Sequence, residues 1–171
     1  MEKKKSDSKN KYIAALAAGI SISFAVIVLI VIIINNKSKV ITCPQTSDQP
    51  NLGYKTETTI EISYDGNHAK SVKSIKKIEA TDKEKLTEQI NSYASQYDLN
   101  NASYGGYTNS LNTIDDTHAT FVGEINYEKV DMQKFIKDNP AMEQYTEGAK
   151  LTKDGAKRMY EASGATCEEH K

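Results

Sequence analysis

The chain has 171 residues, of which 26% are charged and 38% are hydrophobic. Its mean hydropathy of −0.59 excludes a transporter that lies entirely within the membrane, because such a protein is apolar along most of its length. Residues 1–11 hold five lysines and two acidic residues, a net charge of +3, whereas residues 35–171 hold 17 basic and 21 acidic residues, a net charge of −4. The acidic part would repel a phosphate backbone, so nucleic acid is excluded as a partner.

The first predicted element is a membrane-spanning helix at residues 12–34. These 23 residues contain no charged side chain, and a helix of that length measures about 34 Å against a hydrocarbon core of about 30 Å. A cleaved signal peptide has a shorter apolar run followed by small residues, whereas here the small residues come first. A lipid anchor on Cys43 is rejected, because Lys37 and Lys39 separate that cysteine from the apolar run.

The lysines next to this helix predict its orientation. Five lysines precede it and only Lys37 and Lys39 follow it closely, so we expect the amino terminus in the cytoplasm. The predicted parts of this single-pass cell-membrane protein are a basic cytoplasmic tail (1–11), a transmembrane helix (12–34), a linker (35–39) and an extracytoplasmic domain (40–171). Ala15, Gly19 and Ser23 form a stripe that can support a homodimer, although small residues are also common in membrane helices generally.

Cys43 and Cys167 are the only cysteines, and they lie near the two ends of the predicted outer domain. An even pair outside the cytoplasm predicts a disulfide bond. A zinc site is disfavoured, because the pair lacks the spacing of a zinc motif and no histidine lies near Cys43. Two unlinked thiols, in a host that rarely makes structural disulfides, are the remaining alternative.

Strict alternation makes residues 54–64 the strongest predicted strand. The residues on its buried face are Tyr54, Thr56, Thr58, Ile60, Ile62 and Tyr64. Asp65-Gly66-Asn67 indicates a turn, which we extend to a five-residue loop at 65–69 before a returning strand at 70–78. The cross-strand partners are then Ile62 with Val72, Glu61 with Lys73, and Glu57 with Lys77.

The sequence Thr81-Asp82-Lys83-Glu84 has the form of a capping box and predicts a helix from Asp82 to about Tyr97. Its buried stripe is Leu86, Ile90, Tyr93, Ala94 and Tyr97. Before this hairpin we predict a strand at 40–43, which Pro44 ends or confines to an edge, and a loop at 45–53. After the helix we predict a loop at 100–103, a strand at 104–111 weakened by Gly105-Gly106, a turn at 112–116 and a strand at 118–127. The last part is predicted to contain a short helix capped by Asp131 that stops near Pro140, an undefined polar stretch at 141–150, a helix at 153–163 capped by Thr152, and extended residues at 165–167. This order predicts an α+β domain, in which an antiparallel sheet of four to five strands packs against two to three helices.

Several of these segments together resemble a known family. They are Ile41-Thr42-Cys43, the hairpin through Ile60 to Asn67, the tyrosine-rich helix, the segment Ile125 to Asp131, and the last helix, which begins after Leu151-Thr152, ends on Gly164 and leads to Cys167. Over about residues 40–167 the chain resembles the YehR-like family of small bacterial lipoproteins, and more closely its membrane-anchored relatives in Gram-positive bacteria with a cysteine at each end. The resemblance implies a fold and a location but no activity. The departure is an uncleaved helix in place of a lipid anchor.

Asp115-Asp116-Thr117-His118 is the one cluster that could support catalysis or metal binding. If His118 opens a strand, Asp116 and His118 share a face and offer an oxygen and a nitrogen to a cation. Three or four ligands are needed and no others are visible, so a solvated turn explains the cluster better. No nucleotide, zinc-protease, calcium or serine-hydrolase motif is present. We therefore predict no cofactor, no metal and no catalytic residue.

Tyr104-Gly105-Gly106-Tyr107 is the most plausible ligand contact, because it presents two aromatic rings on a flexible backbone. A kinked strand explains the same residues. The function predicted from the sequence is a non-catalytic binding module at the cell surface, whose partner is an envelope protein, a wall polymer or a small ligand. The alternative is an envelope hydrolase or metal-dependent enzyme that uses His118 with Asp116.

Overall fold

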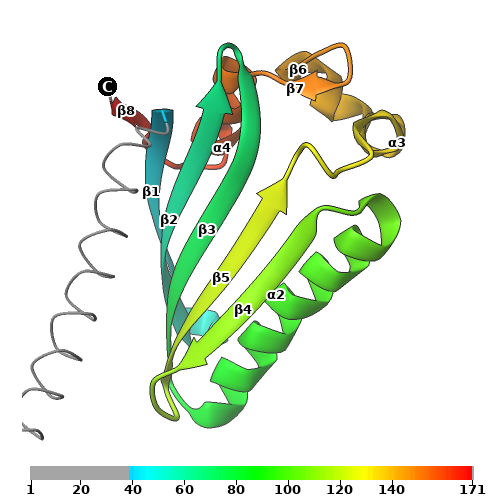
Figure 1. Ribbon diagram of the computed structural model, residues 1–171. Helices are drawn as coiled ribbons and strands as arrows, with labels where there is room; N and C mark the ends of the chain where they lie inside the picture. Colours follow the sequence, from blue (N-terminus) through cyan, green and yellow to red (C-terminus); the bar gives the residue numbers. More distant parts are fainter. Residues whose placement is uncertain (1–38, 171) are drawn as a thin grey trace, which may run out of the picture. The chain divides into compact units, whose positions relative to one another are not determined.

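The computed structural model describes residues 39–170 (Figure 1). The predicted basic tail, the membrane-spanning helix at 12–34, the linker up to residue 38 and the stripe of Ala15, Gly19 and Ser23 lie outside the described residues. Within 39–170, no helix has both the length and the apolar character needed to cross a membrane.

The described residues form an α+β domain, as predicted. Its antiparallel sheet has six strands, in the order β4-β5-β3-β2-β1-β8, rather than the predicted four to five, because the short carboxyl-terminal strand β8 also pairs with β1. The strands of this sheet are β1 (Lys39–Gln49), β2 (Tyr54–Asp65), β3 (His68–Ala80), β4 (Tyr107–Thr113), β5 (His118–Asn126) and β8 (Glu168–His170). The helices are α2 (Lys83–Tyr104), α3 (Met132–Asp138) and α4 (Lys153–Ala162), with 3-10 helices η1 (Pro50–Leu52) and η2 (Pro140–Tyr145). A separate small hairpin pairs β6 (Thr146–Glu147) with β7 (Lys150–Leu151).

Strand β1 is much longer than predicted and runs through Pro44 to Gln49. Pro44 is tolerated because its carbonyl accepts a hydrogen bond from the Thr166 amide, 3.1 Å away. A strand residue points its N–H and C=O to the same side, so the missing N–H of Pro44 faces away from β2. Contrary to the prediction, Pro44 neither ends the strand nor confines it to an edge, because β1 continues to Gln49 and lies between β2 and β8. The predicted loop at 45–53 is likewise wrong for residues 45–49.

The hairpin of β2 and β3 has the predicted register, with Ile62 opposite Val72, Glu61 opposite Lys73 and Glu57 opposite Lys77. The loop is tighter than predicted, because β2 ends at Asp65 and β3 begins at His68. A bulge next to Ser63 and Tyr64 absorbs the difference, since Ser63 pairs with Ser71 and Tyr64 with Ala69. The alternating pattern therefore determined the pairing, and the turn lies at Gly66-Asn67 as predicted, although the predicted five-residue loop is too long.

The helices bury one face of the sheet. Helix α2 contacts β3, β4 and β5, and α4 contacts β1, β2 and β3; Figure 1 shows α2 running beside β4 and α4 lying behind the upper ends of β2 and β3. The core under α2 contains Ile78, Ala80, Leu86, Ala119 and Phe121, with the predicted stripe of the helix packed against it. The core under α4 includes Ile41, Ile60, Ile62, Val72, Leu151 and Ala156.

The caps of the helices explain their bounds. Asp82 accepts a hydrogen bond from the Lys85 amide, Asp131 from the Lys134 amide and Thr152 from the Gly155 amide. The last two caps were predicted, whereas the predicted capping box of α2 is shifted by one residue. The end of α2 was predicted at about Tyr97, but the helix continues to Tyr104.

Candidate functional site

Two glycines place Tyr104 and Tyr107 at the same end of the sheet. Gly105 and Gly106 have φ angles of 70° and 78°, and they reverse the chain between the last residue of α2 and the first of β4. A Cβ atom on Gly106 would lie 2.7 Å from the carbonyl oxygen of Asn126, so a side chain does not fit there. The predicted strand at 104–111 is therefore wrong for residues 104–106: Tyr104 belongs to the helix, and β4 begins at Tyr107.

Tyr104 and Tyr107 line one open groove between α2, β4 and α3, with a volume of about 400 Å³. Small-molecule sites have volumes of about 300–1,000 Å³, so the groove is large enough for one. Its walls are formed by Gln96, Tyr97, Asn100, Tyr104, Tyr107, Ile125, Phe135 and Asn139. We call this set the aromatic groove. It contains four aromatic rings, two of which belong to the predicted ligand-contact residues Tyr104 and Tyr107, and three side-chain amides.

The rings of the aromatic groove pack edge to face in two pairs. The centroids of Tyr104 and Phe135 are 5.0 Å apart, and those of Tyr97 and Tyr107 are 6.0 Å apart. Tyr107 is only 6% exposed, so it forms the floor of the groove, whereas Tyr104 is half-buried on the rim. Of the two predicted ligand-contact residues, Tyr107 is therefore buried beneath the groove and Tyr104 is the one that a ligand can reach.

Burial changes the ionisation of the tyrosines at this end of the sheet. Desolvation raises the pKa of Tyr107 to about 12, with the neighbouring Tyr97 and Tyr104 adding to the effect. Burial also raises the pKa values of Tyr97 and Tyr160, and it raises that of Tyr127 well above the ordinary value. All four hydroxyls therefore stay protonated, and neutral, at physiological pH.

We predict that the free energy of unfolding is insensitive to these tyrosines below pH 10 and falls as the pH rises from about 10 to 12. In the unfolded chain a tyrosine loses its proton near pH 10, whereas in the folded chain Tyr107 keeps it until about pH 12. The folded state then binds more protons, so raising the pH favours unfolding. Urea denaturation at pH 8, 10, 11 and 12 measures the free energy of unfolding. In Tyr107→Phe this free energy should fall less steeply with pH than in the parent protein. An equally steep fall in the variant would contradict the raised pKa of Tyr107.

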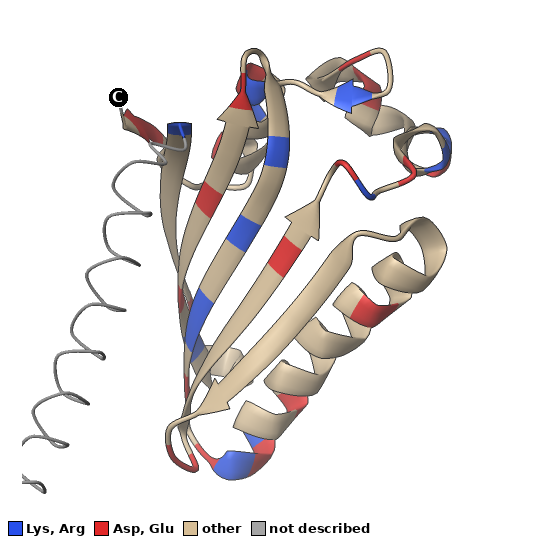
Figure 2. Cartoon of the chain, viewed as in Figure 1, with Lys and Arg blue, Asp and Glu red and all other residues tan. Residues whose placement is uncertain are grey.

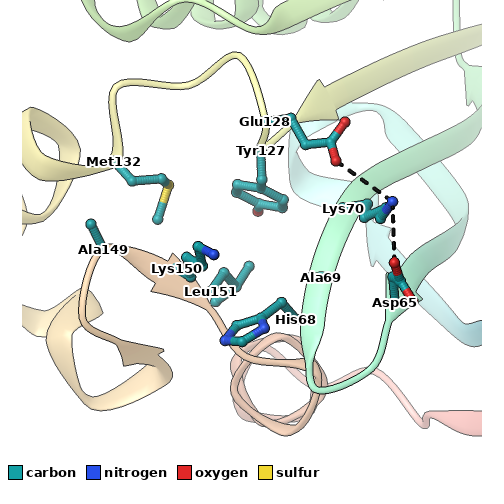
Figure 3. A pocket seen from close by; sticks show the side chains of 10 residues that line it. All are labelled: Asp65, His68, Ala69, Lys70, Tyr127, Glu128, Met132, Ala149, Lys150 and Leu151. Carbon is teal, nitrogen blue, oxygen red and sulfur yellow. Dashed lines mark ion pairs between the residues drawn. The ribbon is translucent and has the colours of Figure 1, made fainter.

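A second concavity, of about 320 Å³, lies where the β2–β3 hairpin faces the loop after β5 and the β6–β7 hairpin (Figure 3). Lys70 bridges Asp65 and Glu128 at 3.4 and 3.6 Å across its rim. The imidazole of His68 lies 3.8 Å from the Glu147 carboxylate. The sequence did not indicate this pocket, because its residues come from three segments far apart in the chain. Its rim is charged and holds neither of the predicted ligand-contact residues, whereas the aromatic groove holds both, so we take the aromatic groove as the candidate site.

The predicted pairing of Asp116 with His118 is not formed. Asp116 lies 3.0 Å from the Lys83 ammonium, and the His118 ring lies 3.0 Å from Asp115. The side chain of His118 makes its hydrogen bonds only to Asp115 and Thr117, within its own turn. Hydrogen bonds from Thr117 and His118 lower the pKa of Asp115. Across residues 39–170, no three histidine, cysteine or acidic side chains come close enough together to hold a metal.

The predicted disulfide is confirmed: Cys43 of β1 is bonded to Cys167, just before β8. Cys43 is fully buried and Cys167 is 9% exposed. The bond fixes the carboxyl-terminal segment against the outer edge of β1, where β8 pairs with residues Val40 to Thr42. The two chain ends of the domain are therefore joined at one edge of the sheet.

Comparison with known proteins gives a family of unknown function. The model of a domain of unknown function, DUF8824, matches residues 34–171. No curated protein matches the chain. Similar solved structures include the NMR structure of YehR from E. coli, at 20% identity and a TM-score of 0.49, which covers 76% of this chain and 91% of that one. Another is the NMR structure of a protein from Streptococcus pneumoniae TIGR4, at 14% identity and a TM-score of 0.44, which covers 78% and 87%.

Those TM-scores are too low for either structure to support an argument about site or activity. The resemblance to YehR-like proteins that the sequence suggested is seen only as this distant similarity. The family model, in contrast, spans all residues that the structure describes. The chain belongs to the family of the domain of unknown function DUF8824.

Proposed function

We propose that the protein is a single-pass, membrane-anchored binding module whose outer domain holds an envelope partner or ligand in the aromatic groove without catalysing a reaction. The observation that carries this proposal is the composition of the groove, which combines aromatic rings with amides. Such a surface offers contact area and hydrogen bonds. Its walls contain no histidine, carboxylate or lysine that could act as a general acid or base near neutral pH.

The proposed location outside the cytoplasm is supported by two independent features. The Cys43–Cys167 bond is of a kind that persists in oxidising compartments and is rare in the cytosol. The uncharged run at 12–34, with five lysines before it, favours an anchor that leaves the amino terminus inside. Together they support a domain that faces the cell exterior.

We predict that Tyr104→Ala lowers retention of the full-length protein on isolated envelopes of its native cells by roughly tenfold, because a few aromatic side chains often dominate binding energy. Tyr104→Leu should lose nearly as much retention while keeping bulk against Phe135. Sedimentation of the detergent-solubilised protein with washed envelopes measures the bound fraction. Tyr107 is unsuited to this test, because it is only 6% exposed and its removal would lower stability.

The matched control is Tyr145→Ala, which removes another half-buried tyrosine outside the groove, where its ring packs near Arg158. Retention of this variant should equal that of the parent protein. Equal retention of Tyr104→Ala and the parent, with unchanged melting temperatures, would contradict the proposed site.

A further inference from the structure

We infer that the aromatic groove binds a neutral carbohydrate segment, an inference that rests on the proposed function and specifies its ligand class. The first argument is charge. Residues 99–114 contain no charged side chain in a chain that is 26% charged, and Figure 2 shows the last turns of α2 and all of β4 free of charge colouring. The groove itself is lined by no ammonium, guanidinium or carboxylate group.

The charges nearest to the groove are paired with each other. The ammonium of Lys134 lies 4.6 Å from the centre of the Tyr104 ring and 2.7 Å from the Asp138 carboxylate. This ion pair lowers the pKa of Asp138 and raises that of Lys134. Because these two charges already have partners, a phosphate, carboxylate or amine entering the groove would gain little from them for the water that it gives up. An uncharged ligand avoids this cost.

The second argument is the unused hydrogen-bonding capacity of the amides. Gln96 and Asn100 lie four residues apart on the face of α2 that lines the groove. Within residues 39–170, neither side-chain amide makes a hydrogen bond to another protein group, and the Asn139 amide uses only its nitrogen, on the Phe135 carbonyl 3.0 Å away. Each free amide both donates and accepts, as does each hydroxyl of a sugar.

The third argument concerns the rings. A pyranose presents an apolar face of C–H groups and a rim of hydroxyls, which matches an aromatic ring flanked by amides. A purely aliphatic ligand would leave those amides without partners. A peptide strand added at β4 is disfavoured near the groove, because the Tyr107 amide already donates to the Asn101 side chain at 3.2 Å. A neutral carbohydrate uses both the rings and the amides.

The test is calorimetric titration of the full-length protein in a polyoxyethylene detergent, since a glycoside detergent could itself occupy the groove. The probes are chitotetraose, cellotetraose, maltotetraose and mannotetraose as neutral sugars, tetragalacturonate as an anionic sugar, and fully deacetylated chitosan tetramer as a cationic sugar. We expect saturable binding of at least one neutral probe and none of the charged ones. Gln96→Ala and Asn100→Ala should each weaken that binding about 3- to 10-fold, the effect of one lost hydrogen bond.

Matched controls remove the same groups elsewhere: Gln133→Ala on α3 and Asn91→Ala on α2 change exposed amides outside the groove and should leave binding unchanged. Melting temperatures should not fall in any of the four variants, because alanine is the better helix former. Binding of only a charged probe, of no probe, or of neutral sugars unaffected by Gln96 and Asn100, would overturn the inference. If envelope retention still depended on Tyr104 in that case, the binding function would stand with a different ligand class.

Discussion

Replacing Phe121 with alanine should lower the free energy of unfolding by about 3–5 kcal/mol, the largest effect we expect from any single substitution. Phe121 is 1% exposed and lies at the centre of the core between α2 and the sheet. The Tyr93 and Tyr97 rings of α2 pack against it at centroid distances of 5.6 and 5.7 Å. Alanine leaves a cavity beneath both rings, which the helix can fill only by shifting.

Urea denaturation followed by far-ultraviolet circular dichroism measures this loss. Val122→Ala is the matched control, because it shortens the next residue of β5, which points to the opposite, half-exposed face of the sheet. The control should lose much less stability than Phe121→Ala. Similar losses of stability in Phe121→Ala and Val122→Ala would contradict the central place of Phe121 in the core. Because Tyr97 also lines the aromatic groove, Phe121→Ala should in addition weaken ligand binding.

Removing the disulfide with the double substitution Cys43→Ser and Cys167→Ser should cost about 2–5 kcal/mol. The two cysteines are 124 positions apart, so the bond closes nearly the whole domain into one loop. In the chain-entropy model a loop of this length restricts the unfolded chain by about 5 kcal/mol. The serine hydroxyl at position 43 would also be fully buried among Ile41, Ile60 and other apolar residues, which adds a cost.

Guanidinium denaturation of the parent protein, with and without a reductant, and of the double variant measures this effect. The reduced parent and the double variant should both unfold at lower denaturant concentrations than the oxidised parent. Strand β8 has only three residues and follows Cys167 directly, so its amides should exchange faster in the variant. A midpoint that does not move on reduction would contradict a stabilising role for this bond.

The sequence predicted best where a local pattern and the tertiary packing agree. Strand β2 alternates without interruption and its register follows, because shifting by one residue would turn Ile60 and Ile62 outward. Asp131 and Thr152 are followed by apolar residues at helical spacing, so their caps could be identified. In these segments few alternative structures compete.

Prediction from the sequence failed where contacts between residues far apart in the chain determine the local structure. The run from Asn100 to Ser103 consists mostly of weak helix formers and indicates a loop. In the folded chain the Asn101 side chain accepts a hydrogen bond from the Tyr107 amide, and the Tyr104 ring packs on Phe135 of α3. These tertiary contacts extend α2 to Tyr104. The β6–β7 hairpin was missed for a similar reason, since two-residue strands leave no periodic pattern.

The candidate site was half predictable. Tyr104 and Tyr107 were singled out because two tyrosines flank two glycines, a pattern visible within four residues. Gln96 and Asn100 gave no signal, because polar residues next to an apolar helical stripe are ordinarily solvated. Only the docking of α3, through Phe135, turns that side of α2 into the wall of a groove. The enzyme alternative relied on Asp116, whose carboxylate turned out to pair with Lys83.

The side of the membrane on which the domain lies can be measured directly in intact native cells. The full-length protein should carry a different epitope tag at each end, and a protease that cannot cross the membrane should be added before and after lysis. We predict that the carboxyl-terminal tag is lost from intact cells while the amino-terminal tag survives on a membrane-bound fragment. A carboxyl-terminal tag that is protected until the cells are lysed would contradict the proposed extracytoplasmic binding module.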